Sequence, residues 1–310
     1  MIRYVFKRLL MLIPTLLAVS FIVYFIVDLA PGDDLDVKYG SEISKEELDA
    51  MREKMGYNDN VVIRYFRYMG RMLRGDLGVS SQSGESVFKL YMNKLPNTAR
   101  LTLWGIAVSL IIAIPLGILA ALKQNTWIDA LCTIIGLAGI SLPCFCTGLF
   151  LILLFASKPD SLLPSYGADY WYSIILPAIT VGLSGAGLIL RTTRSSMLEV
   201  IRQDYLRTAR AKGVNERTII LKHALRNALI PIITVAGNSI AVNIGGAVIT
   251  ETVFAWPGVG RMIIGAIGAR DINLVTGGII MTTMISSILT LLVDIIYGFV
   301  DPRIKARYTK

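Results

Sequence analysis

Charged residues are scarce in this chain of 310 residues. Asp, Glu, Lys and Arg make up only 17% of it, whereas hydrophobic residues make up 54%, and the mean hydropathy is +0.60. A soluble domain carries about one quarter charged residues. The few charges present cannot cover the surface of so apolar a chain in water. The composition therefore excludes an ordinary soluble protein and indicates one that lies in a membrane.

Six long stretches contain no Asp, Glu, Lys, Arg or His: 9–27, 101–122, 130–157, 171–190, 227–250 and 274–293. About 20 apolar residues cross the hydrocarbon layer as a helix, so the sequence predicts an all-α fold with six transmembrane helices in one domain. The third stretch is long enough to tilt or to bend. The first is expected to remain as a span, because Asp28 and Pro31 make a poor signal-peptide cleavage site.

The missing ionisable residues also exclude several functions. Proton-coupled transporters, pumps and voltage sensors usually carry such residues inside the membrane. Intramembrane proteases need a Ser–His pair or paired Asp residues there. The dipeptide Gly-Lys does not occur, so the chain has no P-loop. The sequence therefore predicts no enzyme and no ATPase site, and energy for any active transport would come from another subunit.

Cysteine and histidine are rare as well. Cys132, Cys144 and Cys146 all lie in the third stretch, and the one histidine, His223, lies in a polar segment. A zinc-type site would need several such ligands together. We expect the cysteines to pack as small apolar side chains, and we predict no metal site.

The charge that is present lies mostly on one side of the predicted membrane. Segments 1–8, 123–129, 191–226 and 294–310 hold 17 basic and 6 acidic residues, and the remaining segments hold 14 and 16, which accounts for all 31 and 22. Cytoplasmic loops are enriched in Lys and Arg. Both termini and the 191–226 loop are therefore predicted to be cytoplasmic. Topology explains the net charge of +9 without nucleic acid as a partner.

Uncharged polar residues interrupt the fourth and fifth stretches. In a bundle of helices, such side chains either line a solute path or form hydrogen bonds between helices. Both interpretations stay open from the sequence. The candidates for a translocation path are Ser184, Asn238, Ser239 and Asn243.

The 191–226 segment has a helix–Gly–helix pattern. Its first half is compatible with a helix, Gly213 is suited to the left-handed conformation that ends one, and Asn215 followed by Glu216 can begin the next. The alternative is a solvated basic loop, which would explain the charge but not this order of residues.

The longest polar segment, 29–100, is predicted to be a helical insertion on the other side of the membrane. Ser44 and Glu47 match a capping box. A second helix is expected from about 61 to 74, ended by Gly75. Its predicted apolar face consists of Val62, Phe66, Met69 and Leu73, and its basic face of Arg64, Arg67, Arg71 and Arg74. Such a helix would pack on the spans, rest at the membrane interface or meet a partner protein.

The 204–213 stretch resembles the EAA loop of ABC-importer permeases. Ala209 and Gly213 match that pattern, whereas Arg207 stands at its Glu position and Thr208 at its first Ala. Further on, Arg226 stands where many permeases have proline, and a proline follows later as Pro231. The residues that the resemblance assigns to ATPase coupling are Asp204, Tyr205, Arg207, Thr208, Ala209, Arg210, Ala211, Lys212 and Gly213.

Other blocks are similar to the dipeptide/oligopeptide/nickel subfamily of these permeases. They include the pair 245–246 (Gly-Gly), the triplets 31–33 (Pro-Gly-Asp) and 269–271 (Ala-Arg-Asp), the block 74–78 and the ending 301–304. The long loop after the first span indicates the first of the two paired permeases. The residues that this resemblance places at an outer turn or gate are Glu251, Phe254, Trp256, Pro257, Gly258 and Gly260.

The resemblance implies a type I importer permease in a bacterial cytoplasmic membrane. The chain would form half of a pore with a second, homologous permease. Two ABC ATPase subunits and an extracytoplasmic solute-binding protein would complete the complex. The coupling helix would lie in a groove of the ATPase, where ATP and Mg²⁺ would bind, and this chain itself would bind no cofactor. Dipeptides or oligopeptides are the expected cargo, with nickel or a metal chelate as the alternative. A gradient-driven transporter or channel, or a purely structural subunit, remains as a competing interpretation.

Overall fold

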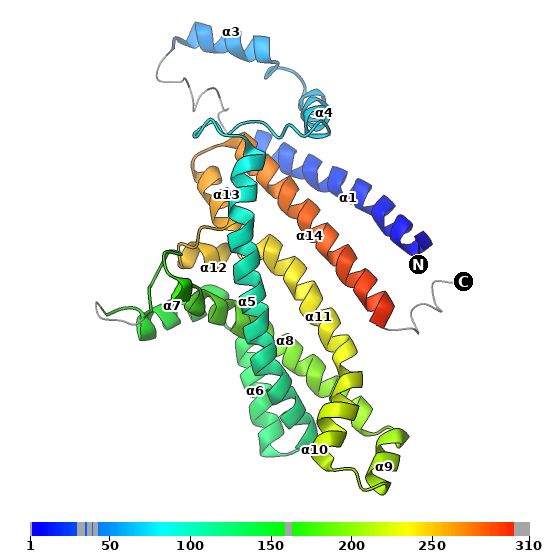
Figure 1. Ribbon diagram of the computed structural model, residues 1–310. Helices are drawn as coiled ribbons and strands as arrows, with labels where there is room; N and C mark the ends of the chain where they lie inside the picture. The colour runs from blue at the N-terminus through cyan, green and yellow to red at the C-terminus, as the bar shows by residue number, and fades with distance from the viewer. Residues whose placement is uncertain (1, 30–34, 36–38, 40–42, 159–162, 301–310) are drawn as a thin grey trace.

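The chain is almost entirely helical. The computed structural model describes residues 2–29, 35, 39, 43–158 and 163–300 (Figure 1), and the predicted motifs at 31–33 and 301–304 lie outside them. The described part contains helices, turns and one isolated bridge between Val79 and Ser86. The predicted all-α membrane fold is confirmed.

Within the described residues, five helices are long and apolar enough to cross a membrane, and a bent helix pair raises the number to six. The long helices are α1 (Ile2–Asp28), α5 (Val87–Leu122), α8 (Ile175–Ile201), α11 (Leu225–Gly246) and α14 (Ile272–Val300). The 3-10 turn η1 (Trp171–Ile174) leads into α8. Several helices run beyond the uncharged stretches, because helix formation does not stop where the hydrocarbon ends. Thus α5 begins well before residue 101, and α8 ends well after residue 190.

The bent pair occupies the third uncharged stretch. Helices α6 (Trp127–Ser141) and α7 (Cys144–Phe155) meet at an angle of 102°. The break lies at Leu142 and Pro143. Proline lacks a backbone N–H and disfavours the helical conformation of the residue before it, and Leu142 has an extended backbone with ψ 125°. The expected tilt or bend is therefore a sharp break.

The bundle is built around α5 and α8, which cross closely. Ser109 on α5 donates a hydrogen bond of 2.7 Å to the carbonyl oxygen of Gly182 on α8. A Cβ atom added to Gly182 would lie 2.5 Å from Cγ1 of Val108, so only glycine allows this approach. Where α6 meets α8, a methyl group on Gly187 would collide with the carbonyl oxygen of Gly136. These small residues place α5, α6 and α8 in a compact unit.

The insertion after α1 contains helices α3 (Lys45–Met55) and α4 (Val61–Met72). The predicted capping box is present, with the side chains of Ser44 and Glu47 each bonded to the other's backbone N–H. The predicted helix at 61–74 forms, but only Met69 of its predicted apolar face is buried. The buried side chains are those of Tyr65, Tyr68 and Met69, whereas Val62, Phe66 and Leu73 are exposed.

Candidate functional site

The first candidate site is the helical corner at one end of the bundle. Helix α8 ends at Ile201, and the short helix α9 (Asp204–Ala211) follows at once. Gly213 then has φ 76°, the left-handed conformation expected for it. The side chain of Asn215 accepts a 2.9 Å hydrogen bond from the backbone N–H of Arg217 and caps the next helix. The predicted helix–Gly–helix unit is therefore present, at the end of the bundle opposite α3 and α4 (Figure 1).

The second half of this unit is continuous with α11. It begins as α10 (Glu216–Thr218), continues through one stretch of π-helix, η2 (Ile219–Ala224), and becomes α11 at Leu225. The corner is thus joined to a membrane-crossing helix on each side. Helix α9 is therefore linked by short, largely helical segments to both α8 and α11.

The inner face of α9 is fastened to these neighbours. Leu206 is fully buried in a cluster that includes Met197 of α8, Ile219 of η2 and Ala228 of α11. The hydroxyl oxygen of Tyr205 accepts a hydrogen bond of 2.7 Å from Nδ2 of Asn227 on α11. Burial of a leucine side chain contributes about 1.5–3 kcal/mol, so α9 is held as part of the bundle.

The outer face of α9 is open. The side chains of Asp204 and Arg207 are 96% and 78% exposed, and 3.8 Å separates their closest charged atoms. Ala209 is half-buried against the bundle, so it does not belong to the outer face as the resemblance would imply. The exposed members of the predicted coupling set are Asp204, Tyr205, Arg207, Thr208, Arg210, Ala211, Lys212 and Gly213.

An ion pair closes the corner across Gly213. The guanidinium of Arg210 donates to both carboxylate oxygens of Glu216, the shortest bond being 2.8 Å. This hydrogen bonding lowers the pKa of Glu216 below its ordinary value. Both side chains are partly exposed, so the pair fixes geometry more than it adds stability.

The second candidate site is the turn after α11, where the predicted outer-turn residues gather. Glu251 lies on the short helix α12 (Val248–Val253) and is completely buried. Its carboxylate accepts hydrogen bonds from the hydroxyl of Thr98 on α5, at 2.6 Å, and from the backbone N–H of Arg261 on α13 (Val259–Gly268), at 3.0 Å. One carboxylate therefore joins three helices.

The indole of Trp256 closes the same turn. Phe254 and Trp256 are each only 1% exposed. Nε1 of Trp256 donates to the carbonyl oxygen of Asn97 at 3.0 Å, and Nδ2 of Asn97 donates to the carbonyl oxygen of Pro257 at 3.1 Å. A Cβ atom on Gly258 would collide with the Glu251 carboxylate, and one on Gly260 would collide with Cγ2 and Cα of Val248, so both glycines are required by packing. The predicted outer-turn residues thus form one rigid connection to α5.

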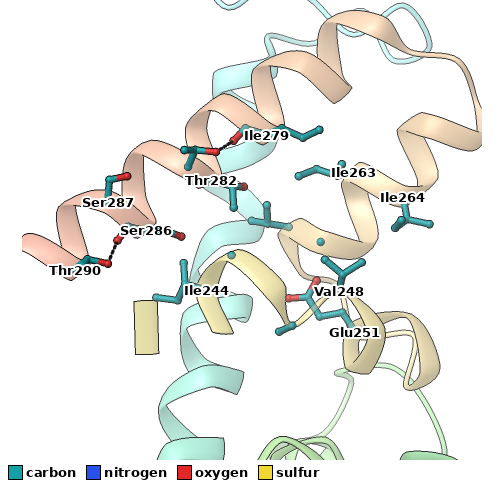
Figure 2. Close-up of a pocket in the computed structure, with 15 residues that line it drawn as sticks. Ile244, Val248, Glu251, Ile263, Ile264, Ile279, Thr282, Ser286, Ser287 and Thr290 are labelled. Atoms are coloured by element: carbon teal, nitrogen blue, oxygen red, sulfur yellow. Dashed lines mark hydrogen bonds between the residues drawn. The ribbon is translucent and has the colours of Figure 1, made fainter. Parts of the chain in front are cut away.

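A cavity of about 390 Å³ opens beside this turn, between α11, α12, α13 and α14. Figure 2 shows Glu251 at one end of it and the hydroxyl side chains of α14 along one wall. Sequence reasoning did not select these residues, although hydroxyls recur every three or four positions in the last stretch. They are Thr282, Thr283, Ser286, Ser287 and Thr290.

The predicted path residues do not line that cavity. Ser184 and Asn238 are exposed on α8 and α11. Ser239 donates to the carbonyl oxygen of Val235 at 2.9 Å, and Asn243 donates to that of Ser239 at 2.8 Å. Ser239 and Asn243 thus form hydrogen bonds within α11, whereas Ser184 and Asn238 are exposed. Among the described residues, no group of three or more His, Cys, Asp or Glu side chains lies close enough to hold a metal ion.

Comparison with known proteins relates this architecture to one family. Residues 113–306 match the family described as binding-protein-dependent transport system inner membrane component, and residues 1–102 match the N-terminal part of such components. In solved structures, the inward-facing MetNI methionine ABC transporter has a chain with a TM-score of 0.58 at 18% identity. That match covers 68% of this chain and 96% of the other. At this identity the similarity concerns the fold, which is that of a type I importer permease.

Curated relatives match over nearly the whole length. The glutathione transport system permease protein GsiC of Shigella flexneri is 37% identical over 305 residues, covering 98% of this chain and 99% of the relative. The dipeptide transport system permease protein DppB of Alkalihalophilus pseudofirmus is 37% identical over 333 residues, covering 98% and 100%. The chain belongs to the binding-protein-dependent transport system inner membrane components, the permease subunits of ABC importers.

Proposed function

We propose that this permease forms half of a translocation pathway for short peptides. Support comes from the relatives, whose names specify a dipeptide and glutathione, itself a short peptide. The uncharged spans agree with a path that does not select cargo by charge. The other half of the pathway would come from a second, homologous permease.

The partner that drives transport would be an ABC ATPase bound at α9. The observation that carries this proposal is that α9 has one face buried in the bundle through Leu206 and one face open to solvent. The open face is short and exposes the charges of both Asp204 and Arg207. Such a face can bind in a groove of a partner protein. Closure of two ATPases would move α9, and α8 and α11 would follow because both are joined to it.

The exposed polar side chains of Ser184 on α8 and Asn238 on α11 are proposed to face the pathway. Ser239 and Asn243 lie on α11 as well. Both α8 and α11 connect directly to the corner that carries α9. A movement of the corner therefore changes the position of the helices that carry the candidate path residues. This is the geometry that alternating access requires.

The positive-inside distribution of charge supports a cytoplasmic location for α9 and both termini. The insertion that contains α3 and α4 then lies outside, where a solute-binding protein delivers cargo. The ATP and Mg²⁺ of the cycle belong to the ATPase subunits, since this chain has no Gly-Lys dipeptide and thus no P-loop.

The test is uptake by the assembled importer in proteoliposomes with its solute-binding protein. We expect ATP supplied on the cytoplasmic side to drive uptake of a radiolabelled dipeptide. A non-hydrolysable ATP analogue should abolish uptake, and collapse of ion gradients with ionophores should leave it unchanged. Uptake of ⁶³Ni²⁺ but of no peptide would replace the peptide assignment with a metal, and uptake that follows an ion gradient without ATP would contradict the importer mechanism.

A further inference from the structure

Helix α4 presents three different faces. The buried face carries Tyr65, Tyr68 and Met69. A basic face carries Arg64, Arg67 and Arg71, and between the two lies an apolar flank that the fold leaves uncovered. On this flank Val62 is 42%, Ile63 54% and Phe66 65% exposed. Side chains of this kind do not normally form a continuous patch in water.

The contacts of α4 with α1 fix its depth in the membrane. The hydroxyl group of Tyr65 lies 2.9 Å from the hydroxyl of Ser20 and donates at 3.1 Å to the carbonyl oxygen of Leu17. Its ring packs edge-on against Phe21, with 5.1 Å between the centroids. Ser20 lies eight residues before Asp28, the end of α1, which corresponds to roughly 12 Å along the helix. Helix α4 therefore lies beside the last turns of α1 and not above them.

The exposed apolar surface of α1 continues onto α4. Ile22, Phe25 and Ile26 of this span are 55%, 41% and 61% exposed, as expected for side chains in contact with lipid. The rings of Phe21, Tyr65 and Phe66 follow one another in edge contacts, from α1 to the uncovered flank of α4. Figure 1 shows α4 against the end of α1. A lipid layer that covers this part of α1 therefore reaches the flank of α4.

The basic face lies where the polar headgroups would be. Arg64 pairs with Asp28 at 2.6 Å, and Arg67 pairs with Asp59 at 2.7 Å. The guanidinium of Arg71 lies 6.0 Å from the ring centre of Tyr68. Arginine and tyrosine side chains with an apolar body and a polar end are enriched at this level of a bilayer.

We propose that α4 is an interfacial helix whose flank of Val62, Ile63 and Phe66 inserts among the lipids of the leaflet farthest from α9. Its tyrosine face contacts α1, and its arginine face, where Arg64 and Arg67 pair with Asp28 and Asp59, lies at the level of the lipid headgroups. The helix thus attaches the insertion to the bilayer as well as to the bundle. This explains why the aliphatic residues of α4 are not its buried face: tyrosine supplies the hydroxyl that Ser20 and Leu17 bind.

The test compares two adjacent positions in the assembled importer in nanodiscs. Nitroxide labels are placed at Phe66→Cys and, as the matched control, at Arg67→Cys, in a background that carries Cys132→Ala, Cys144→Ala and Cys146→Ala. Collision with oxygen reports lipid, and collision with a water-soluble nickel chelate reports water. We expect the oxygen-to-nickel ratio to be several-fold higher at position 66 than at position 67.

Two results would overturn the proposal. An equal ratio at the two positions would mean that water covers the flank. A several-fold loss of oxygen collisions at position 66 when cargo-loaded binding protein is added would mean that a protein covers it instead. Neither result depends on transport, so the interfacial helix and the peptide pathway fail or hold separately.

Discussion

The side chains of Tyr205 on α9 and Asn227 on α11 share a hydrogen bond of 2.7 Å, with the amide as donor. Tyr205 also donates to the carbonyl oxygen of His223 at 3.4 Å. The bond joins the proposed coupling helix to the base of a membrane-crossing helix. We propose that this partly exposed phenol, fixed by its hydrogen bonds, transmits movement from α9 to α11.

Tyr205→Phe is expected to loosen this connection while leaving Leu206 in place. The lost hydrogen bond is worth about 0.5–1.5 kcal/mol. We expect fewer cargo molecules to be transported per ATP hydrolysed, because α9 would move without taking α11 with it. The measurement is uptake and ATP hydrolysis in the same proteoliposomes.

Asn227→Ala should have the same effect, and the double variant should be no worse than either single one. Thr192→Ala is the control, since Thr192 lies outside the proposed coupling set and its hydroxyl donates within α8, to the carbonyl oxygen of Leu188. Additive losses in the double variant would show that the two side chains do not act together.

Replacement of Glu251 by alanine is expected to destabilise the whole subunit. The change leaves the Thr98 hydroxyl and the backbone N–H of Arg261 without their buried acceptor, at a cost of about 1–3 kcal/mol. A lower midpoint of thermal unfolding of the purified complex would show it. Glu251→Gln keeps the shape and one acceptor oxygen, so its midpoint should lie between those of the wild type and Glu251→Ala.

The control for that comparison is Glu199→Ala, at an exposed glutamate on α8. Its midpoint should remain that of the wild type. If Glu251→Ala unfolded at the same temperature as Glu199→Ala, the buried carboxylate would have no structural role.

The Arg210–Glu216 pair predicts a pH dependence of the corner. Because Arg210 lowers the pKa of Glu216 in the folded protein, the pair contributes its stability above the ordinary glutamate pKa of 4.5 and loses it as pH falls through the lowered value. Amide hydrogen exchange in α9 and α10 should be unchanged near neutral pH and should increase, relative to α5, only in that acidic range.

Glu216→Gln removes the charge at all pH values, so it should raise exchange in the corner at neutral pH and abolish the acid transition. The effect should correspond to no more than about 1 kcal/mol, since the pair is partly exposed. An acid transition that persists in Glu216→Gln would have to be assigned to another group.

Local signals in the sequence were enough to predict the helical corner at Gly213 and the capped helices. Gly213, Asn215 and the Ser44–Glu47 pair act on their immediate neighbours, and the structure has them in the predicted conformations. The six uncharged stretches correspond to helices because their length and composition leave few alternatives. The break at Pro143 was compatible with the sequence, but its angle of 102° depends on how α7 packs against α8 and α12.

Contacts between distant residues could not be predicted. The Glu251–Thr98 bond joins residues 153 positions apart, so the sequence suggested a turn and offered no partner for the carboxylate. Met69 was predicted correctly on the buried face of α4, but the burial of Tyr65 in place of Val62 and Phe66 was not, because hydropathy ranks Val62 and Phe66 above Tyr65. The Tyr65 hydroxyl has partners 45 and 48 positions away on α1, which no local pattern reveals.

The central claim is that α9 couples this permease to an ATPase, and Gly213→Val tests it most directly. Gly213 has a left-handed backbone, with φ 76°, and a Cβ atom added to it would meet no atom within 4 Å. Valine there is therefore strained but not crowded, and the strain is worth about 1–2 kcal/mol. Gly75→Val imposes the same strain at φ 84°, also in open space, in the insertion between α4 and α5.

The measurement is cargo transported per ATP hydrolysed by the two variants, with both inserted in the membrane at wild-type levels. The account predicts that Gly213→Val loses most of this ratio while Gly75→Val keeps it. Intact transport with Gly213→Val, or an equal loss in both variants, would contradict the coupling role of α9.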